Sequence, residues 1–154
     1  MGNQVSFDLL RLDSWEGEAF TVYLDDEPLF SQRFYNWQNT DASTGDTNGI
    51  NWSLTPTTDW TELYGSNFGS YTSYDQRFRV SLQLPAGRMA VKLGFGSGLN
   101  QAADDESYAI DNLEIRSADN PLIAVNTFDT ADGWAGGAIS ELAGAGSVLG
   151  PYAA

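Results

Sequence analysis

Strict alternation of apolar and polar side chains over residues 76–84 is the feature that most restricts how this chain can fold. Phe78, Val80, Leu82 and Leu84 occupy every second position, and the residues between them are polar. A period of two places successive side chains on opposite faces of a β-strand, whereas an amphipathic helix requires a period of 3.6. The segment therefore predicts a half-buried strand.

Similar alternation recurs along the chain, and no convincing helical pattern interrupts it. Pro85-Ala86-Gly87 supplies a turn, and apolar residues resume at alternate positions over residues 89–95, so we expect an antiparallel hairpin spanning 76–95. The polar run at residues 25–28 predicts a second turn. Further strands are expected at residues 5–9, 20–24, 29–34, 50–55, 107–116 and 121–126, with a weaker one near 137–142.

Many short strands separated by Gly, Asn and Asp predict an all-β fold, an antiparallel β-sandwich that is jelly-roll-like. A chain of 154 residues is long enough for one such domain with one core, which we expect to span residues 1–154. No apolar run approaches the ~20 residues that a membrane-spanning helix requires. Met1-Gly2-Asn3-Gln4 leads directly into a strand without a signal peptide, so we expect either another export route or a piece of a longer protein.

The chain carries 21 acidic and 7 basic residues, a formal net charge of −14. Partners that bind by neutralising phosphates or anionic lipids are therefore excluded, and we expect no nucleic-acid partner and no membrane insertion. So much negative charge repels itself in a compact fold. The repulsion is easier to tolerate if cations lie among the carboxylates.

The sequence contains neither Cys nor His. Zinc, copper and most iron sites depend on thiolate or imidazole ligands, so a bound metal is expected to be a hard one such as Ca²⁺. Without disulfides, calcium also serves as the stabilising element in many extracellular modules, and we expect an extracellular or cell-surface location. Ser-His-Asp and Cys-His catalysis are excluded, so we expect no enzyme. A glycosidase that needs only two carboxylates is the catalytic alternative.

Three acidic clusters, at residues 13–18, 104–106 and 129–133, supply the kind of oxygen ligand that calcium prefers. None of them matches an EF-hand loop or a Gly-rich nonapeptide repeat, so the site is expected to be assembled from distant segments. The alternatives are a solvated acidic loop for the second cluster and an ordinary Asp-Gly turn for the third. The predicted calcium ligands are Asp13, Glu16, Glu18, Asp104, Asp105, Glu106, Asp111, Asp129 and Asp132.

Asp111 is the predicted ligand with the most specific argument. It shares a strand face with Ala109, Leu113 and Ile115, and this phase aims its carboxylate inward. A buried carboxylate is too costly unless it is paired, hydrogen-bonded or bound to a metal. The alternative is that Asp111 caps neighbouring backbone amides.

Two long polar stretches, residues 36–49 and 57–75, carry aromatic residues in or beside them. Long loops on a rigid sandwich are common sites of function, and exposed rings there predict a stacking surface for a carbohydrate or a peptide. The alternative is that each ring attaches its own loop to the sheet. The candidate ligand-binding residues are Trp37, Trp52, Trp60, Tyr64, Tyr71 and Tyr74.

Two segments, VSFDLLRLDSWEGEAFTVYLD at residues 5–25 and SYAIDNLEI at residues 107–115, resemble a module of the large calcium-rich RTX adhesins of Gram-negative bacteria. The resemblance implies a jelly-roll ligand-binding domain for cell adhesion or biofilm formation. In that family calcium holds loops and, in peptide- or sugar-binding members, engages the ligand. The resemblance also implies calcium ligands at Asp13, Glu16, Glu18 and Asp111.

The order of segments departs from the family pattern. A segment like FDTADGWAGG at residues 128–137, followed by one like SVLGPY at 147–152, precedes the VSFD strand in the family but follows it here. Residues 127–154 are thus part of a circularly permuted domain, the start of a following module, or a segment that completes a neighbouring molecule. Three functions follow: a binding module, a fibre subunit assembled by exchange of its C-terminal segment, or a calcium-rigidified spacer.

Overall fold

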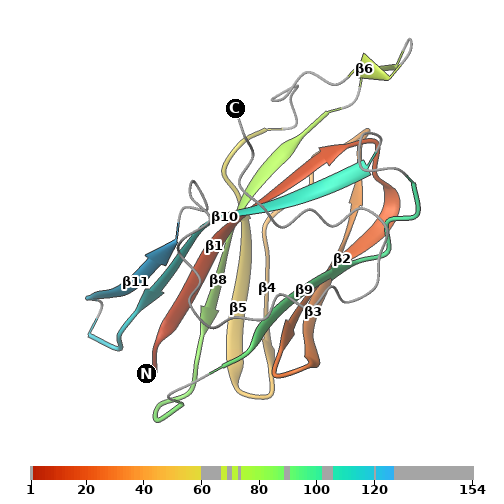
Figure 1. The fold of residues 1–154 in the computed structure, drawn as a ribbon. Helices are drawn as coiled ribbons and strands as arrows, with labels where there is room; N and C mark the ends of the chain where they lie inside the picture. The colour runs from red at the N-terminus through yellow and green to blue at the C-terminus, as the bar shows by residue number, and fades with distance from the viewer. Residues whose placement is uncertain are drawn as a thin grey trace.

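The computed structural model describes residues 2–59, 67–68, 71–72, 74–88, 91–101, 106–119 and 121–126. These residues form two antiparallel sheets that pack together, without a helix (Figure 1). The predicted antiparallel β-sandwich is confirmed. The weaker strand predicted at 137–142, and the whole of 127–154, lie outside the described residues.

The larger sheet has the strand order β11-β10-β1-β8-β5-β4, and the smaller has the order β3-β2-β9. Two short strands, β6 and β7, pair only with each other among the described residues. The strands are β1 (Gln4–Asp13), β2 (Glu16–Leu24), β3 (Glu27–Tyr35), β4 (Ser43–Thr47), β5 (Ile50–Pro56), β6 (Asn67–Phe68), β7 (Tyr71–Thr72), β8 (Gln76–Gln83), β9 (Leu93–Ser97), β10 (Glu106–Arg116) and β11 (Leu122–Asn126).

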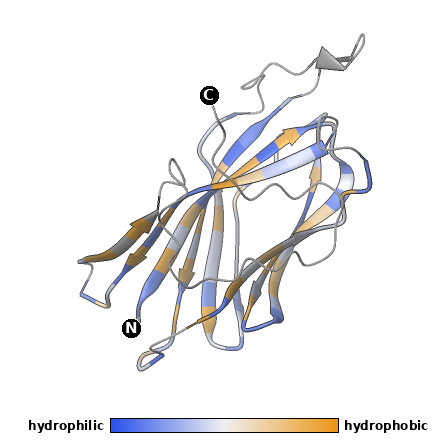
Figure 2. Cartoon of the chain, in the orientation of Figure 1, coloured by the Kyte–Doolittle hydropathy of each residue, from blue (hydrophilic) through white to orange (hydrophobic). Residues whose placement is uncertain are grey.

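The core lies between the two sheets, and Figure 2 shows apolar and polar residues alternating along the strands that enclose it. Aromatic pairs join one sheet to the other. Phe7 of β1 meets Phe95 of β9 with ring centroids 5.0 Å apart, and Phe20 of β2 meets Tyr108 of β10 at 5.0 Å. Both pairs are edge-to-face, an arrangement that adds about 0.5–1.5 kcal/mol to the burial of the rings.

The strand at 76–84 is confirmed, but the hairpin predicted with residues 89–95 is wrong. β8 alternates between buried and half-buried residues as expected, and it lies between β1 and β5. β9 pairs instead with β2 in the other sheet. The turn after β8 therefore carries the chain from the larger sheet to the smaller one. The apolar faces of β8 and β9 pack into the same core from opposite sides.

Residues 36–49 were expected to form a long loop, but they include the strand β4. β4 and β5 form a hairpin around Asn48 and Gly49, whose φ angles are 54° and 77°. Positive φ at both central residues is typical of a type I′ turn, for which Asn-Gly is the preferred sequence. The Asn-Gly pair was thus a signal for this hairpin. The turn predicted at residues 25–28 is present, with φ of 52° at Asp25 and 70° at Asp26.

The turn between β2 and β3 is tied to the segment before β9, and Asp25 makes the connection. Its carboxylate accepts a hydrogen bond from the backbone N–H of Lys92 at 2.7 Å and forms an ion pair with Arg88. The hydrogen bond from Lys92 and the charge and hydrogen bond of Arg88 lower the pKa of Asp25 below its usual value. These interactions extend the pairing of β2 with β9 in the smaller sheet and hold the connection between β8 and β9 against the turn.

The lowered pKa of Asp25 predicts a pH-dependent contribution to stability. A carboxyl group whose pKa falls on folding stabilises the native state above its unfolded pKa of about 3.9, and this contribution disappears as the pH falls through the lower, folded value. We expect Asp25→Asn, which still tolerates the left-handed turn, to unfold at a lower temperature than wild type at pH 7 but not at about pH 2. Thermal unfolding across this range, with the exposed Asp119→Asn as control, measures it. A difference from wild type that does not change with pH would contradict this role.

Candidate functional site

One end of the sandwich brings together two of the predicted acidic clusters (upper right in Figure 1). β1 and β10 are antiparallel, so Asp13 at the end of β1 lies opposite Glu106 at the start of β10. Residues directly opposite in such a pair have Cα atoms about 4.5–5.5 Å apart. The indole N–H of Trp15 also donates to the carbonyl of Ser107 at 2.8 Å. Segments more than ninety residues apart therefore meet at this end, which we call the acidic end.

A third carboxylate at the acidic end was not predicted. Asp75, immediately before β8, is buried, and its Oδ1 accepts a hydrogen bond from the backbone N–H of Asp13 at 3.0 Å. The sequence places Asp75 at the end of a long polar stretch, which predicts an ordinary loop residue. Only the strand order, in which β8 lies beside β1, reveals that it belongs here.

Glu106 is the carboxylate that β10 directs inward. It is fully buried and in phase with the buried Tyr108 and Ile110, and its Oε1 accepts a hydrogen bond from Gln101 Nε2 at 3.0 Å. Burial of an ionised carboxylate is costly without strong compensation. Glu106 is therefore the charged residue of β10 whose burial costs the most free energy of folding.

The inward direction predicted for Asp111 is wrong, because β10 contains a bulge. The register shifts between Ser6 opposite Glu114 and Asp8 opposite Asp111, and Asn112 in between has a φ of 49°. The extra residue reverses the phase of the strand, so Asp111 lies on the outer face with Asp8. Five residues also separate it from Glu106, roughly 16 Å of strand, so the two cannot bind one ion.

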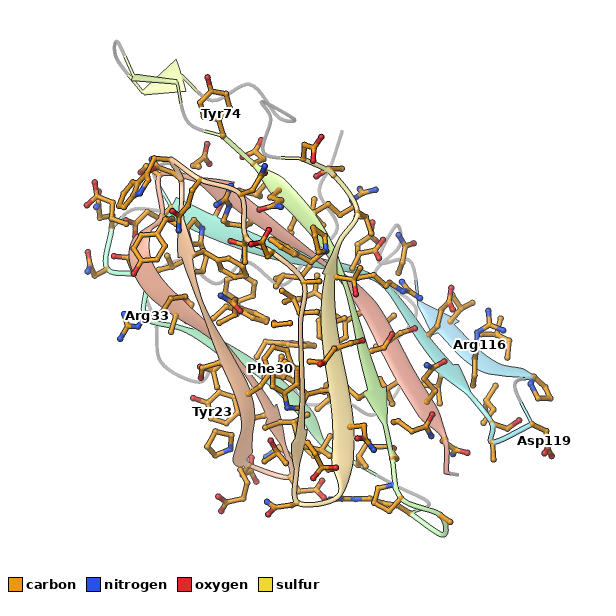
Figure 3. All side chains as sticks on the ribbon, turned by 180° about the vertical axis from the view of Figure 1, so that it is seen from behind. Tyr23, Phe30, Arg33, Tyr74, Arg116 and Asp119 are labelled. Carbon is orange, nitrogen blue, oxygen red and sulfur yellow. The ribbon has the colours of Figure 1, made fainter. Side chains whose placement is uncertain are left out.

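The outer face beside the bulge is a network of ion pairs. Arg79 contacts Asp8 at 3.0 Å and Glu114 at 3.2 Å, and Arg116 also contacts Glu114 at 3.2 Å. The amide of Asn112 donates to the other oxygen of Asp8 at 2.8 Å. Figure 3 shows Arg116, a member of this network, far from Tyr74, which precedes Asp75 at the acidic end. These carboxylates thus contribute to the sheet and not to the acidic end.

Glu16 and Glu18 begin β2, close in sequence to Asp13. Glu16 is exposed, and its backbone N–H donates a hydrogen bond to Glu18 Oε2 at 2.6 Å. Between them Gly17 has a φ of 117°, and a Cβ there would lie 3.0 Å from the ring of Tyr35. The ring of Tyr35 therefore packs closely against Gly17.

Trp37 is the candidate ligand-binding ring that the structure exposes most clearly. Its side chain is 55% exposed, and its ring lies 5.0 Å from that of Tyr35. Trp52, in contrast, stacks on Phe30 at 4.5 Å and packs against the core. Tyr74 is half-buried.

Most of the other predicted site residues fall outside the described ranges. Among the candidate rings, Trp60 and Tyr64 lie outside the described residues, and Tyr71 is described only by its backbone in β7. The remaining predicted calcium ligands, Asp104, Asp105, Asp129 and Asp132, also lie outside the described residues.

Arg11 attaches the loops of the acidic end to the sheet. Its side chain is buried, and its guanidinium donates hydrogen bonds to the carbonyls of Tyr35, Gln38 and Tyr74. Burial lowers the pKa of Arg11 to about 10, opposed by the charge of Asp75, so it remains protonated at neutral pH. A positive charge thus lies inside this acidic end. The sequence contained a signal for this burial, because Arg11 falls on the same face of β1 as the buried Phe7 and Leu9.

The donor set of the acidic end consists of carboxylate oxygens, which suits a hard cation such as Ca²⁺. Within the described ranges, however, no group of three or more acidic side chains lies close enough together to hold a metal ion. Asp104 and Asp105 immediately precede Glu106 in the sequence, outside these ranges. A complete ligand set would therefore require them, other undescribed carboxylates or backbone carbonyls.

No helix in the described part of the chain is long and apolar enough to cross a membrane. A scan against protein-family models and searches of curated proteins and of solved structures found no match to this chain.

Proposed function

We propose that this chain is a calcium-stabilised, extracellular binding module, without catalytic activity, that takes a carbohydrate or a peptide at the acidic end. The observation that carries the proposal is the register that sets Asp13 opposite Glu106. Like charges directly opposite in a sheet are destabilising. A divalent cation shared by these carboxylates turns the repulsion into attraction.

The residues that would hold the ion are Asp13 and Glu106, with Asp75 beside them and Asp104 or Asp105 from the preceding segment. Glu16 and Glu18 are near enough in sequence to contribute from the start of β2. Bound calcium would supply positive charge that fastens the ends of β1 and β10 together. It would also attract the hydroxyl or carboxylate oxygens of a ligand.

Trp37 supports a binding function beside this ion. Its ring is 55% exposed and therefore offers an aromatic face to a ligand. Its packing against Tyr35 limits its rotamers, so less conformational entropy is lost when a ligand binds. An aromatic face stacks on sugar rings and on peptide side chains alike.

The test of this function is binding to glycan and peptide arrays with and without EDTA. We expect binding that EDTA abolishes. Binding that persists in EDTA would contradict the role of calcium. Stabilisation by calcium without any bound ligand would indicate a spacer instead of a binding module.

The two tryptophans on either side of β4 provide a matched pair of variants. Trp37→Ala is expected to weaken ligand binding at least tenfold and to leave the unfolding temperature unchanged, because the ring is exposed. Trp52→Ala is expected to cost roughly 2–3 kcal/mol of stability, somewhat less than a fully buried ring, because Trp52 stacks on Phe30. Array binding and thermal unfolding of both variants check this. Full binding by Trp37→Ala would place the ligand elsewhere.

A further inference from the structure

β11 is an apolar strand at the edge of the larger sheet. It pairs with β10 on one side, and it is the last strand on that side among the described residues. Leu122, Ile123 and Val125 are 48%, 57% and 54% exposed. Natural edge strands usually carry charges or proline that prevent pairing with other chains, and Leu122–Asn126 has neither. β4, at the opposite edge, is entirely polar.

The chain continues from β11 into residues 127–154, and the sequence there contains a hairpin signal. Asp-Gly is among the strongest signals for a two-residue turn, and it occurs at Asp132 and Gly133. A two-residue turn at this position pairs Ala131 with Trp134. Counting outwards, residue 126 then pairs with 139, 125 with 140, and 123 with 142.

We propose that residues 138–143 of the same chain dock on the open edge of β11 as an additional antiparallel strand. In this register Leu142 lies beside Ile123, on the same face of the sheet, so two apolar side chains cover each other. The backbone groups on the open edge of β11 gain partners. The short connection also gives this segment a far higher effective concentration at β11 than a second copy has in dilute solution.

The absence of cysteine allows a direct test by disulfide formation in the full-length chain. Residues directly opposite in an antiparallel pair lie about 4.5–5.5 Å apart, within the range for a disulfide. We expect Ile123→Cys with Leu142→Cys to form a bridge within one molecule under mild oxidation. The matched control is Ile123→Cys with Glu141→Cys, which are one residue out of register and therefore on opposite faces.

The bridge is detected by non-reducing gel mobility and by mass spectrometry of proteolytic fragments. Efficient bridging within monomers for the 123–142 pair, at least fivefold above the 123–141 control, supports the proposal. Bridged dimers would overturn it, because a neighbouring molecule would then supply the strand. Equal bridging by both pairs, or none by either, would also overturn it.

A second variant tests the turn itself. Gly133→Val in the 123–142 background puts a β-branched residue where positive φ is required, so bridging is expected to fall several-fold. Undiminished bridging would overturn the Asp132-Gly133 hairpin. Ile123 is exposed in β11, so its replacement removes no core contact. Both readouts are independent of calcium and of any ligand.

Discussion

Glu106→Gln is expected to abolish the stabilisation of this protein by calcium. An ion that binds only the native state stabilises it by about 2.7 kcal/mol at a hundredfold excess over its Kd. For a domain of this size that raises the unfolding temperature of the wild type by about 5–10 °C relative to EDTA. The variant should show little of this shift, because it lacks the carboxylate opposite Asp13.

The sign of the effect in EDTA makes this prediction specific. Without calcium, Glu106→Gln removes a buried like charge from beside Asp13, so the variant is expected to be at least as stable as the wild type. With calcium it is expected to be less stable. Calorimetry of both proteins in both conditions measures this crossover.

Asp111→Asn is the control for this experiment, since Asp111 lies on the outer face, away from Glu106. It is expected to respond to calcium as the wild type does. If Glu106→Gln and the wild type respond to EDTA equally, Glu106 is not a calcium ligand. If Asp111→Asn alone loses the response, the ion lies at the bulge instead.

Arg11→Met is expected to cause the largest loss of stability of any single substitution considered. Methionine keeps most of the length of the side chain but removes the charge, leaving the carbonyls of Tyr35, Gln38 and Tyr74 without these hydrogen bonds. It also leaves the buried Asp75 without the nearby positive charge. Removing one member of a buried charged group costs about 3–5 kcal/mol.

Denaturant unfolding in EDTA measures this loss separately from calcium binding. The control is Arg33→Met, because Arg33 is exposed although it also donates to a carbonyl, that of Gly17. We expect it to change stability by no more than about 0.5–1 kcal/mol. Equal losses for the two variants would show that the buried position of Arg11 contributes nothing particular.

The candidate site could be predicted only in part. Acidic runs near Asp13 and Glu106 are visible in the sequence, and so is the expectation that distant segments converge. The contribution of Asp75 is not visible, because it depends on β8 lying beside β1. The direction of Asp111 was predicted wrongly because one extra residue in a bulge reverses the phase of a strand, and no simple periodicity reveals that residue.

By itself, the sequence determined which faces are buried in the strands without a bulge, such as β8, and hence that the chain forms a β-sandwich. This is possible because side-chain direction alternates locally along an extended backbone, whatever the strand pairs with. The tertiary structure alone decided which strands are neighbours. It placed β8 and β9 in different sheets, set Asp13 opposite Glu106 and buried Arg11 beneath the loops. These outcomes depend on contacts between residues remote in sequence, whose energies no local pattern records.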